Sequence, residues 1–184
     1  AVIDLGASEG GPRSLKAALE AGALGALADG ARLARADVSL LPVITDPGKI
    51  LCVGLNYATH VAETGREQKA YPAIFTRWAD TLVGDGAPLL KPRRSERFDY
   101  EGELAIIIGT GGRNIAAADA MAHVAGYSAF NDGSVRDWQR HNIQFTPGKN
   151  FPGTGGFGPA LVTPDEIDDL GAQLFLRAQR HIGH

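Results

Sequence analysis

The 184-residue chain has one cysteine, no long apolar run and no excess of charge of one sign. Cys52 alone cannot form a disulfide within the chain, which favours a reducing, cytoplasmic location. No stretch reaches the roughly 20 apolar residues of a transmembrane helix, and the start lacks the segments of a signal peptide. The net charge of −3 is spread over interspersed acidic and basic residues, so no nucleic-acid or membrane partner is expected.

The hydrophobic content of 44% is sufficient for a folded core in one domain with a small appendage. We expect a small α/β module over residues 1–47, with helical patterns at 14–20 and 23–36, and a main domain over 48–184 after a turn at 45–48. The first residue is alanine and the only methionine is Met121, so we expect the original amino terminus to be missing or processed.

Two carboxylates open an apolar run at residues 99–108. The β-branched residues before Gly109 predict a buried strand, whose two-residue period turns Glu101 and Glu103 to one face. A half-buried pair of carboxylates requires a proton or a cation between them. By itself, this common spacing also fits two solvated side chains.

A histidine and a carboxylate are spaced for contact after the apolar strand at residues 50–55. If the chain becomes helical after Asn56, His60 and Glu63 lie on one face, three residues apart. A histidine oriented by a carboxylate can remove a proton from water. An incidental surface ion pair would give the same pattern.

Two glycine-rich turns resemble dinucleotide-binding sequences. A strand, Gly109–Gly112, a helix at 116–123 and a strand ending near Asp132 have the order of a non-catalytic dinucleotide-binding module, although Asn114 replaces the third glycine. The second turn, at residues 153–158, lacks the flanking strand and helix, and we expect a flexible loop beside a site. Asp132 itself is followed by a polar helical turn in which Arg136 and Gln139 share a face, and Lys149 follows a loop.

Taken together, these motifs resemble the fumarylacetoacetate hydrolase family over residues 49–167. The resemblance implies a mostly β fold with some α, a rolled mixed β-sandwich. The family relatives continue beyond the matching region, so we expect the catalytic domain to be incomplete at its carboxy-terminal end. The matching segments are Gly54–Tyr57 with His60 and Glu63, Tyr100–Ala105, Gly126–Gln139, Gly148–Phe151 and Gly158–Thr163.

The resemblance also implies a metal-dependent reaction. It assigns a divalent cation to Glu101, Glu103 and Asp132, and oxygen ligands suit Mg²⁺ best, with Mn²⁺ or Ca²⁺ possible. The expected reaction is catabolic hydrolysis of a carbon–carbon bond in a 2,4-dioxo acid or acylpyruvate, and the alternative is decarboxylation or isomerisation of a 2-oxo acid at the same metal. The resemblance assigns water activation to His60 and Glu63, oxyanion stabilisation to Lys149, and substrate binding to Tyr57, Arg136 and Gln139.

The resemblance leaves the substrate open, because Asn150-Phe151-Pro152 stands where many relatives carry an acid. We also expect a homodimer, because a mostly β domain of this size leaves strand edges and apolar surface to be covered.

Overall fold

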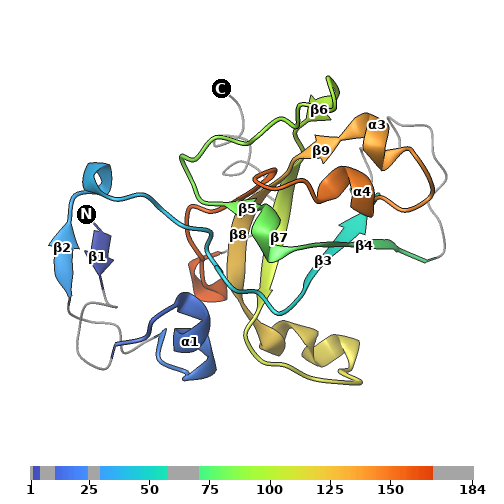
Figure 1. Cartoon of the computed structure of the whole chain (residues 1–184). Helices are drawn as coiled ribbons and strands as arrows, with labels where there is room; N and C mark the ends of the chain where they lie inside the picture. The colour runs from blue at the N-terminus through green and yellow to red at the C-terminus, as the bar shows by residue number, and fades with distance from the viewer. Residues whose placement is uncertain (1, 5–10, 25–29, 58–70, 168–184) are drawn as a thin grey trace.

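The computed structural model describes residues 2–4, 11–24, 30–57 and 71–167 (Figure 1). Within these residues the regular secondary structure is mostly β-strand with a few short helices, as the sequence predicts. The strands are β1 Val2–Asp4, β2 Ala31–Leu33, β3 Ile50–Gly54, β4 Ala73–Arg77, β5 Leu82–Val83, β6 Phe98–Asp99, β7 Gly102–Ile108, β8 Val124–Asp132, β9 Ser134–Val135 and β10 Gly155–Phe157. The α-helices are α1 Leu15–Glu20, α3 Arg136–Gln139 and α4 Thr146–Lys149, and 3₁₀ turns cover Arg35–Asp37, Ala79–Thr81, Ala117–His123 and Pro164–Glu166.

The central sheet is mixed and has the strand order β5-β10-β8-β7. β10 pairs parallel with β5 and antiparallel with β8, and β7 pairs antiparallel with β8. The register places Gly102 opposite Asn131 and Gly155 opposite Asp132. Three further antiparallel pairs, β1–β2, β3–β4 and β6–β9, complete the described strands. The start of β7, the end of β8 and the start of β10 therefore lie together at the same end of the sheet.

The apolar core lies on the central sheet. It consists of Ile44, Ile107, Phe130 and Phe157, and the rings of Phe130 and Phe157 meet edge to face with centroids 5.7 Å apart. Ser14 caps α1 by accepting a hydrogen bond from the Ala17 amide, and Leu15 and Leu19 of this helix pack against the core. Figure 1 shows β1, β2 and α1 on one side of the central sheet, and α3 and α4 on another.

Most of the predicted strands are confirmed, but four local predictions are wrong. Residues 31–33 of the expected second helix form β2, where pairing with β1 overrides the alanine-rich pattern. The expected helix at 116–123 is a 3₁₀ turn, and the expected flexible loop at 153–158 contains β10. The carboxylate strand is only partly buried, since Ile106 and Ile108 are 54% and 60% exposed.

The dinucleotide-binding hypothesis is also wrong. Its fingerprint requires two parallel strands joined by a crossover helix, whereas β7 and β8 are antiparallel neighbours joined through a 3₁₀ turn. Among the helices that the structure describes, none combines the length and apolar character needed to cross a bilayer.

Candidate functional site

Three carboxylates meet where β7 begins and β8 ends. Glu101 immediately precedes β7, Glu103 lies within it, and Asp132 is the last residue of β8. The Asp132 amide donates to the Glu101 carbonyl at 2.9 Å, and the Glu101 amide donates to Asn131 Oδ1 at 3.3 Å. All three carboxylates line one cavity of about 1790 Å³. The predicted proximity of Glu101 and Glu103 therefore extends to Asp132 through sheet pairing.

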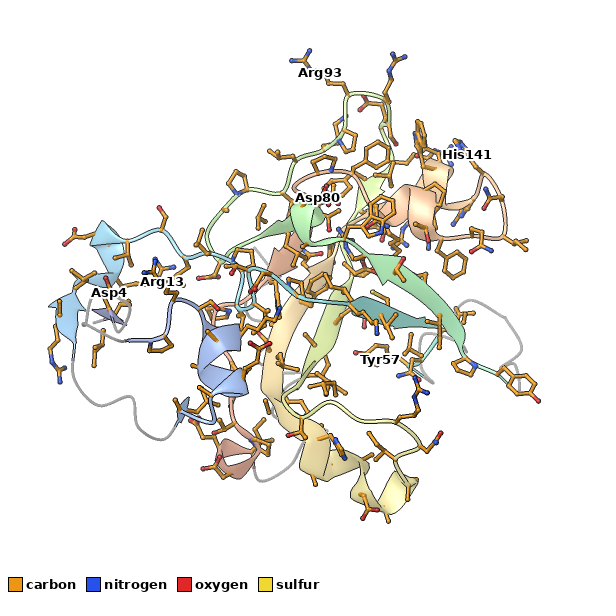
Figure 2. The ribbon with its side chains drawn as sticks, turned by 60° about the horizontal axis from the view of Figure 1, so that its bottom comes forward. Asp4, Arg13, Tyr57, Asp80, Arg93 and His141 are labelled. Atoms are coloured by element: carbon orange, nitrogen blue, oxygen red, sulfur yellow. The ribbon has the colours of Figure 1, made fainter. Side chains whose placement is uncertain are left out.

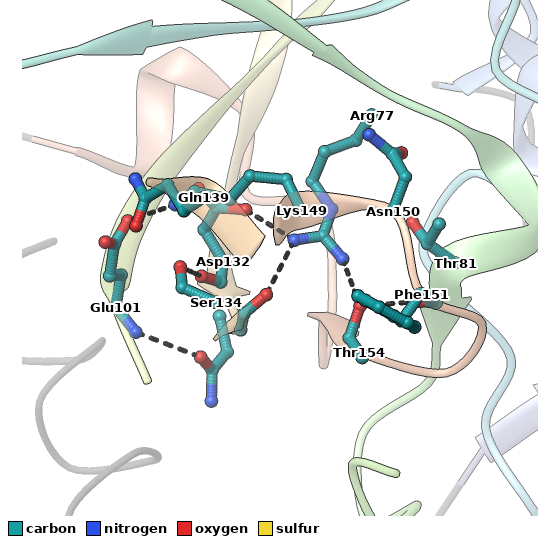
Figure 3. A network of polar contacts seen from close by, with 12 residues as sticks. Arg77, Thr81, Glu101, Asp132, Ser134, Gln139, Lys149, Asn150, Phe151 and Thr154 are labelled. Atoms are coloured by element: carbon teal, nitrogen blue, oxygen red, sulfur yellow. Dashed lines mark hydrogen bonds and ion pairs between the residues drawn. The ribbon is translucent and has the colours of Figure 1, made fainter. Parts of the chain in front are cut away.

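Lys149 lies between two of these carboxylates. Its side chain is 1% exposed, and Nζ donates to Glu101 Oε2 at 2.7 Å and to Asp132 Oδ2 at 2.6 Å (Figure 3). Nζ also lies 5.1 Å from the centroid of the Phe75 ring. Helix α4, which ends at Lys149, directs this ammonium into the site. The predicted neighbourhood of Lys149 and the carboxylates is thus present in the fold.

Arg136 holds the other side of Glu101. From the first position of α3 it donates to Glu101 Oε1, to Gln139 Oε1 at 3.1 Å, and to Asp99 Oδ2 at 2.9 and 2.7 Å. Burial alone would raise the pKa of Glu101, but the charges of Lys149 and Arg136 outweigh burial and hold this pKa below its ordinary value. Glu101 is therefore ionised at neutral pH.

The environment of Glu103 raises its pKa, whereas that of Glu101 lowers it. Burial raises its pKa to about 7, with the negative charges of Glu101 and Asp132 adding to the effect, although a hydrogen bond with Tyr57 opposes it. Figure 2 shows Tyr57 beside β3, and its hydroxyl accepts from the Leu104 amide at 3.3 Å. Burial, followed by the charge of Glu103, raises the pKa of Tyr57 as well. Negative charge is therefore in excess around Glu103.

The donor set fits a hard divalent cation. Glu101, Glu103 and Asp132 offer only oxygen, the ligand that Mg²⁺ prefers. Burial is the main cause of the raised pKa of Glu103, and repulsion from Glu101 and Asp132, which a cation would relieve, adds to it. As the described residues are placed, however, no group of three or more His, Cys, Asp or Glu side chains could hold a metal ion. Lys149 instead provides the positive charge between Glu101 and Asp132. The three predicted ligands stay a prediction.

The predicted catalytic residues divide into two groups. His60 and Glu63 lie outside the described residues, so the structure does not test the predicted dyad. Arg136, Gln139 and Lys149 are brought together, and all three line the cavity with Tyr57. Cys52 also lines this cavity, and burial together with the charge of Asp132 raises the pKa of its thiol to about 12, so the thiol is protonated at neutral pH.

Three residues that hydrogen-bond to the charged side chains of this site were not predicted from the sequence: Arg77, Asp99 and Thr154. Arg77 donates to Asp132 and Thr154, and Asp99 accepts from Arg136. A sequence signal existed for Arg77, because the two-residue period of β4 places it on the same face as Phe75. No comparable signal marks Thr154, whose partner is 77 residues away.

Comparison with known proteins identifies the family of this chain. The family model described as "Fumarylacetoacetate (FAA) hydrolase C-terminal" matches residues 49–181. The chain belongs to the fumarylacetoacetate hydrolase family. Members of this family are generally divalent-metal-dependent enzymes that include hydrolases, tautomerases and isomerases. The resemblance seen in the sequence is therefore confirmed, together with the fold class.

Three relatives illustrate the range of the family. A mitochondrial oxaloacetate tautomerase of Xenopus laevis, fahd2, is 44% identical over 139 residues, which are 74% of this chain and 44% of that protein. A fumarylacetoacetate hydrolase from Exiguobacterium antarcticum matches with a TM-score of 0.68 at 35% identity, covering 84% of this chain and 57% of that one. A 5-carboxymethyl-2-hydroxymuconate delta-isomerase from Mycobacterium smegmatis matches with a TM-score of 0.65 at 34% identity, covering 76% and 55%. The chain thus spans less than half the length of the curated relatives it matches.

Proposed function

We propose that this member of the fumarylacetoacetate hydrolase family binds one divalent cation, Mg²⁺ or Mn²⁺, through Glu101, Glu103 and Asp132, and acts on a short 2-oxo acid. One observation carries the proposal: a buried lysine and three carboxylates line a single large cavity, and the lysine bridges two of them. Perturbed carboxyl groups in a cavity are typical of functional sites.

When bound, the cation would polarise the 2-oxo acid end of the substrate and favour negative charge on its oxygen. The residues of the chain then have separate roles. Lys149 Nζ, fixed by Glu101 and Asp132, holds a proton near the substrate oxygen where negative charge develops. Arg136 and Gln139, already hydrogen-bonded to each other, orient the substrate carboxylate. The Lys149 side chain is 1% exposed, so solvent hardly reaches its ammonium.

Keto–enol tautomerisation or isomerisation of the 2-oxo acid is the first candidate reaction. It moves one proton between carbon and oxygen and requires no activated water, so it does not depend on a water-activating dyad such as His60 and Glu63. The names of the tautomerase and isomerase relatives support it. The sequence alone placed hydrolysis first, and we place tautomerisation ahead of it because of these relatives.

Hydrolysis of an acylpyruvate is the second candidate. The sequence spacing of His60 and Glu63 supports it, because cleavage of the carbon–carbon bond needs a base that activates water. Decarboxylation would use the same cation and the same oxygen stabilisation.

One set of assays, carried out on the chain with Mg²⁺, distinguishes the two candidate reactions. The rate of oxaloacetate enol loss is followed by ultraviolet absorbance, and pyruvate release from acetylpyruvate is followed in parallel. We expect Lys149→Met to reduce turnover at least 100-fold, whereas Lys91→Met, at an exposed ion pair with Glu96, should leave it unchanged. His60→Ala should abolish pyruvate release only.

Full enol loss in Lys149→Met would contradict the role of the lysine. Pyruvate release that depends on His60, without any tautomerisation, would favour the hydrolase. Absence of both reactions from a folded, Mg²⁺-bound protein would contradict the 2-oxo acid assignment.

A further inference from the structure

Arg77 connects two sheets beneath the candidate metal site. It is the last residue of β4, yet its guanidinium contacts the central sheet (Figure 3). NH1 donates to Asp132 Oδ1 at 2.5 Å and to the Gly133 carbonyl at 3.1 Å, and NH2 donates to Thr154 Oγ1 at 2.8 Å. The whole residue is 2% exposed. Asp132 is therefore held on Oδ1 by Arg77 and on Oδ2 by Lys149.

The central sheet leaves room for this guanidinium at one glycine. A Cβ atom on Gly155 would lie 2.9 Å from Arg77 NH2 and 3.2 Å from Cζ, closer than side chains normally approach. On another side, Cζ lies 5.7 Å from the centroid of the Phe130 ring. The contacts that fix Arg77 thus come from β8, β10 and the residues beside them.

The arginine is not fully satisfied in this position. Its Nε is buried and has no hydrogen-bond partner among the described residues. A buried donor without a partner is unfavourable, and a buried ion pair often adds little stability compared with apolar residues of similar volume. Stability alone therefore gives a weak account of a buried arginine at this place.

We propose that Arg77 is a positioning residue that fixes the Asp132 carboxylate for divalent-cation binding. The inference rests on the metal site of the proposed function. The two terminal nitrogens of the guanidinium hold Asp132 Oδ1 and Thr154 Oγ1 at the same time. Arg77 therefore sets the rotation of the Asp132 carboxylate and the direction of its remaining lone pairs. Groups that orient metal ligands in this way typically change metal affinity 10- to 100-fold when they are removed.

A positioning role and a purely electrostatic role of Arg77 predict opposite changes in divalent-cation affinity when the side chain is removed. A positive charge beside the site repels a divalent cation, so a purely electrostatic Arg77 would weaken binding, and its removal would strengthen it. A positioning Arg77 strengthens binding despite its charge. Arg77→Lys separates the two effects further, because lysine keeps the charge but cannot form the planar fork to two acceptors.

The test is Mn²⁺ binding, measured by electron paramagnetic resonance of the free ion, together with the water-proton relaxation rate of the bound ion. We expect Arg77→Met to weaken Mn²⁺ affinity about 10- to 100-fold and Arg77→Lys to weaken it by less. Both should raise the relaxation rate, because a misplaced Asp132 yields its coordination position to water. Arg35→Met, at an exposed ion pair with Asp85, is the matched control and should change neither quantity.

A second variant keeps the arginine itself. Gly155→Ala should push the guanidinium away from Asp132 and therefore also weaken Mn²⁺ binding. If circular dichroism shows that Arg77→Met does not fold, Gly155→Ala and Arg77→Lys test the positioning role instead. Unchanged or tighter binding in the folded Arg77 variants would overturn the positioning role while leaving the metal site intact. A wild-type chain that does not bind Mn²⁺ would overturn the proposed metal site and this inference with it.

Discussion

Positive and negative side chains alternate along the candidate site at the scale of single residues. Each carboxylate in the series contacts at least one cation, and the side chains of Lys149, Asp132 and Arg77 are almost inaccessible to solvent. Breaking such a buried pair by removing one partner typically costs about 3–5 kcal/mol, because the remaining charge is left uncompensated. The series runs Asp99, Arg136, Glu101, Lys149, Asp132 and Arg77.

Glu103 stands outside this series, and none of the cationic side chains that the structure describes forms a hydrogen bond with it. Its pKa rises from the ordinary 4.5 to about 7, so folding of the metal-free chain favours the protonated form. A carboxyl pKa that is higher in the folded state adds stability that is fully present below the unfolded pKa. That contribution is lost as the pH rises through the folded pKa, between about 5 and 8.

We therefore expect the Tm of the metal-free chain to fall as the pH rises from 5 to 8. Glu103→Gln cannot ionise and should flatten this fall, whereas Glu96→Gln, an exposed carboxyl on an outer loop, should not. Thermal unfolding followed by circular dichroism in the presence of a chelator measures both. Parallel losses of Tm in wild type and Glu103→Gln would contradict the assignment of the raised pKa to Glu103.

At the scale of elements, the close approach of α3 and α4 sets the distance between Gln139 and Lys149. Gly148 makes this approach possible, since a Cβ atom there would lie 2.5 Å from both the backbone nitrogen and the Cβ of Gln139. Neither helix exceeds one turn, so their positions come from tertiary contact and not from helix propensity. A change at Gly148 should therefore affect the site as well as stability.

We expect Gly148→Ala to reduce the free energy of unfolding by about 1–3 kcal/mol, as overpacking usually does, and to lower the proposed tautomerase turnover by moving Lys149. Gly111→Ala is the matched control, because nothing lies within 4 Å of the position that its added methyl group would take. Urea unfolding and the enol-loss assay measure the two effects. A Gly148→Ala chain with wild-type stability would show that α3 and α4 separate without cost.

At the scale of the whole molecule, one face of the β3–β4 pair is apolar and exposed. Val53 and Ile74 lie opposite each other across the pair and are 44% and 59% exposed, and Leu51 beside them is 63% exposed. Grouped apolar side chains of this kind are typical of interaction surfaces. They support the homodimer expected from the sequence, which we propose forms through this face.

Light scattering should therefore give a mass near twice 19.3 kDa at micromolar concentration. Ile74→Lys should shift the chain to monomer, because a charge would be buried in the interface. Leu41→Lys is the control: Leu41 is 70% exposed and lies outside the β3–β4 pair. A monomeric wild type, or a dimer unaffected by Ile74→Lys, would contradict the proposed face.

The sequence by itself determined the family, the mostly β fold and part of the site. The strand period placed Glu101 and Glu103 together, and the three-residue spacing brought Arg136 to Gln139, because both relations are local. The boundary predicted between residues 47 and 48 stays a prediction. Residues 31–33 of the helix expected over 23–36 form a strand instead, because strand pairing, a long-range contact, outweighs local propensity.

Only the tertiary structure decided how the charges are paired. Lys149 reaches Glu101 across 48 residues and Arg77 reaches Asp132 across 55, and no local period relates such positions. The same holds for Gly155, which sequence alone placed in a flexible loop and which the fold uses to admit the Arg77 guanidinium. The pKa of Glu103 likewise depends on burial and on charges from other segments, since desolvation and Coulomb interaction follow distance in space and not separation along the chain.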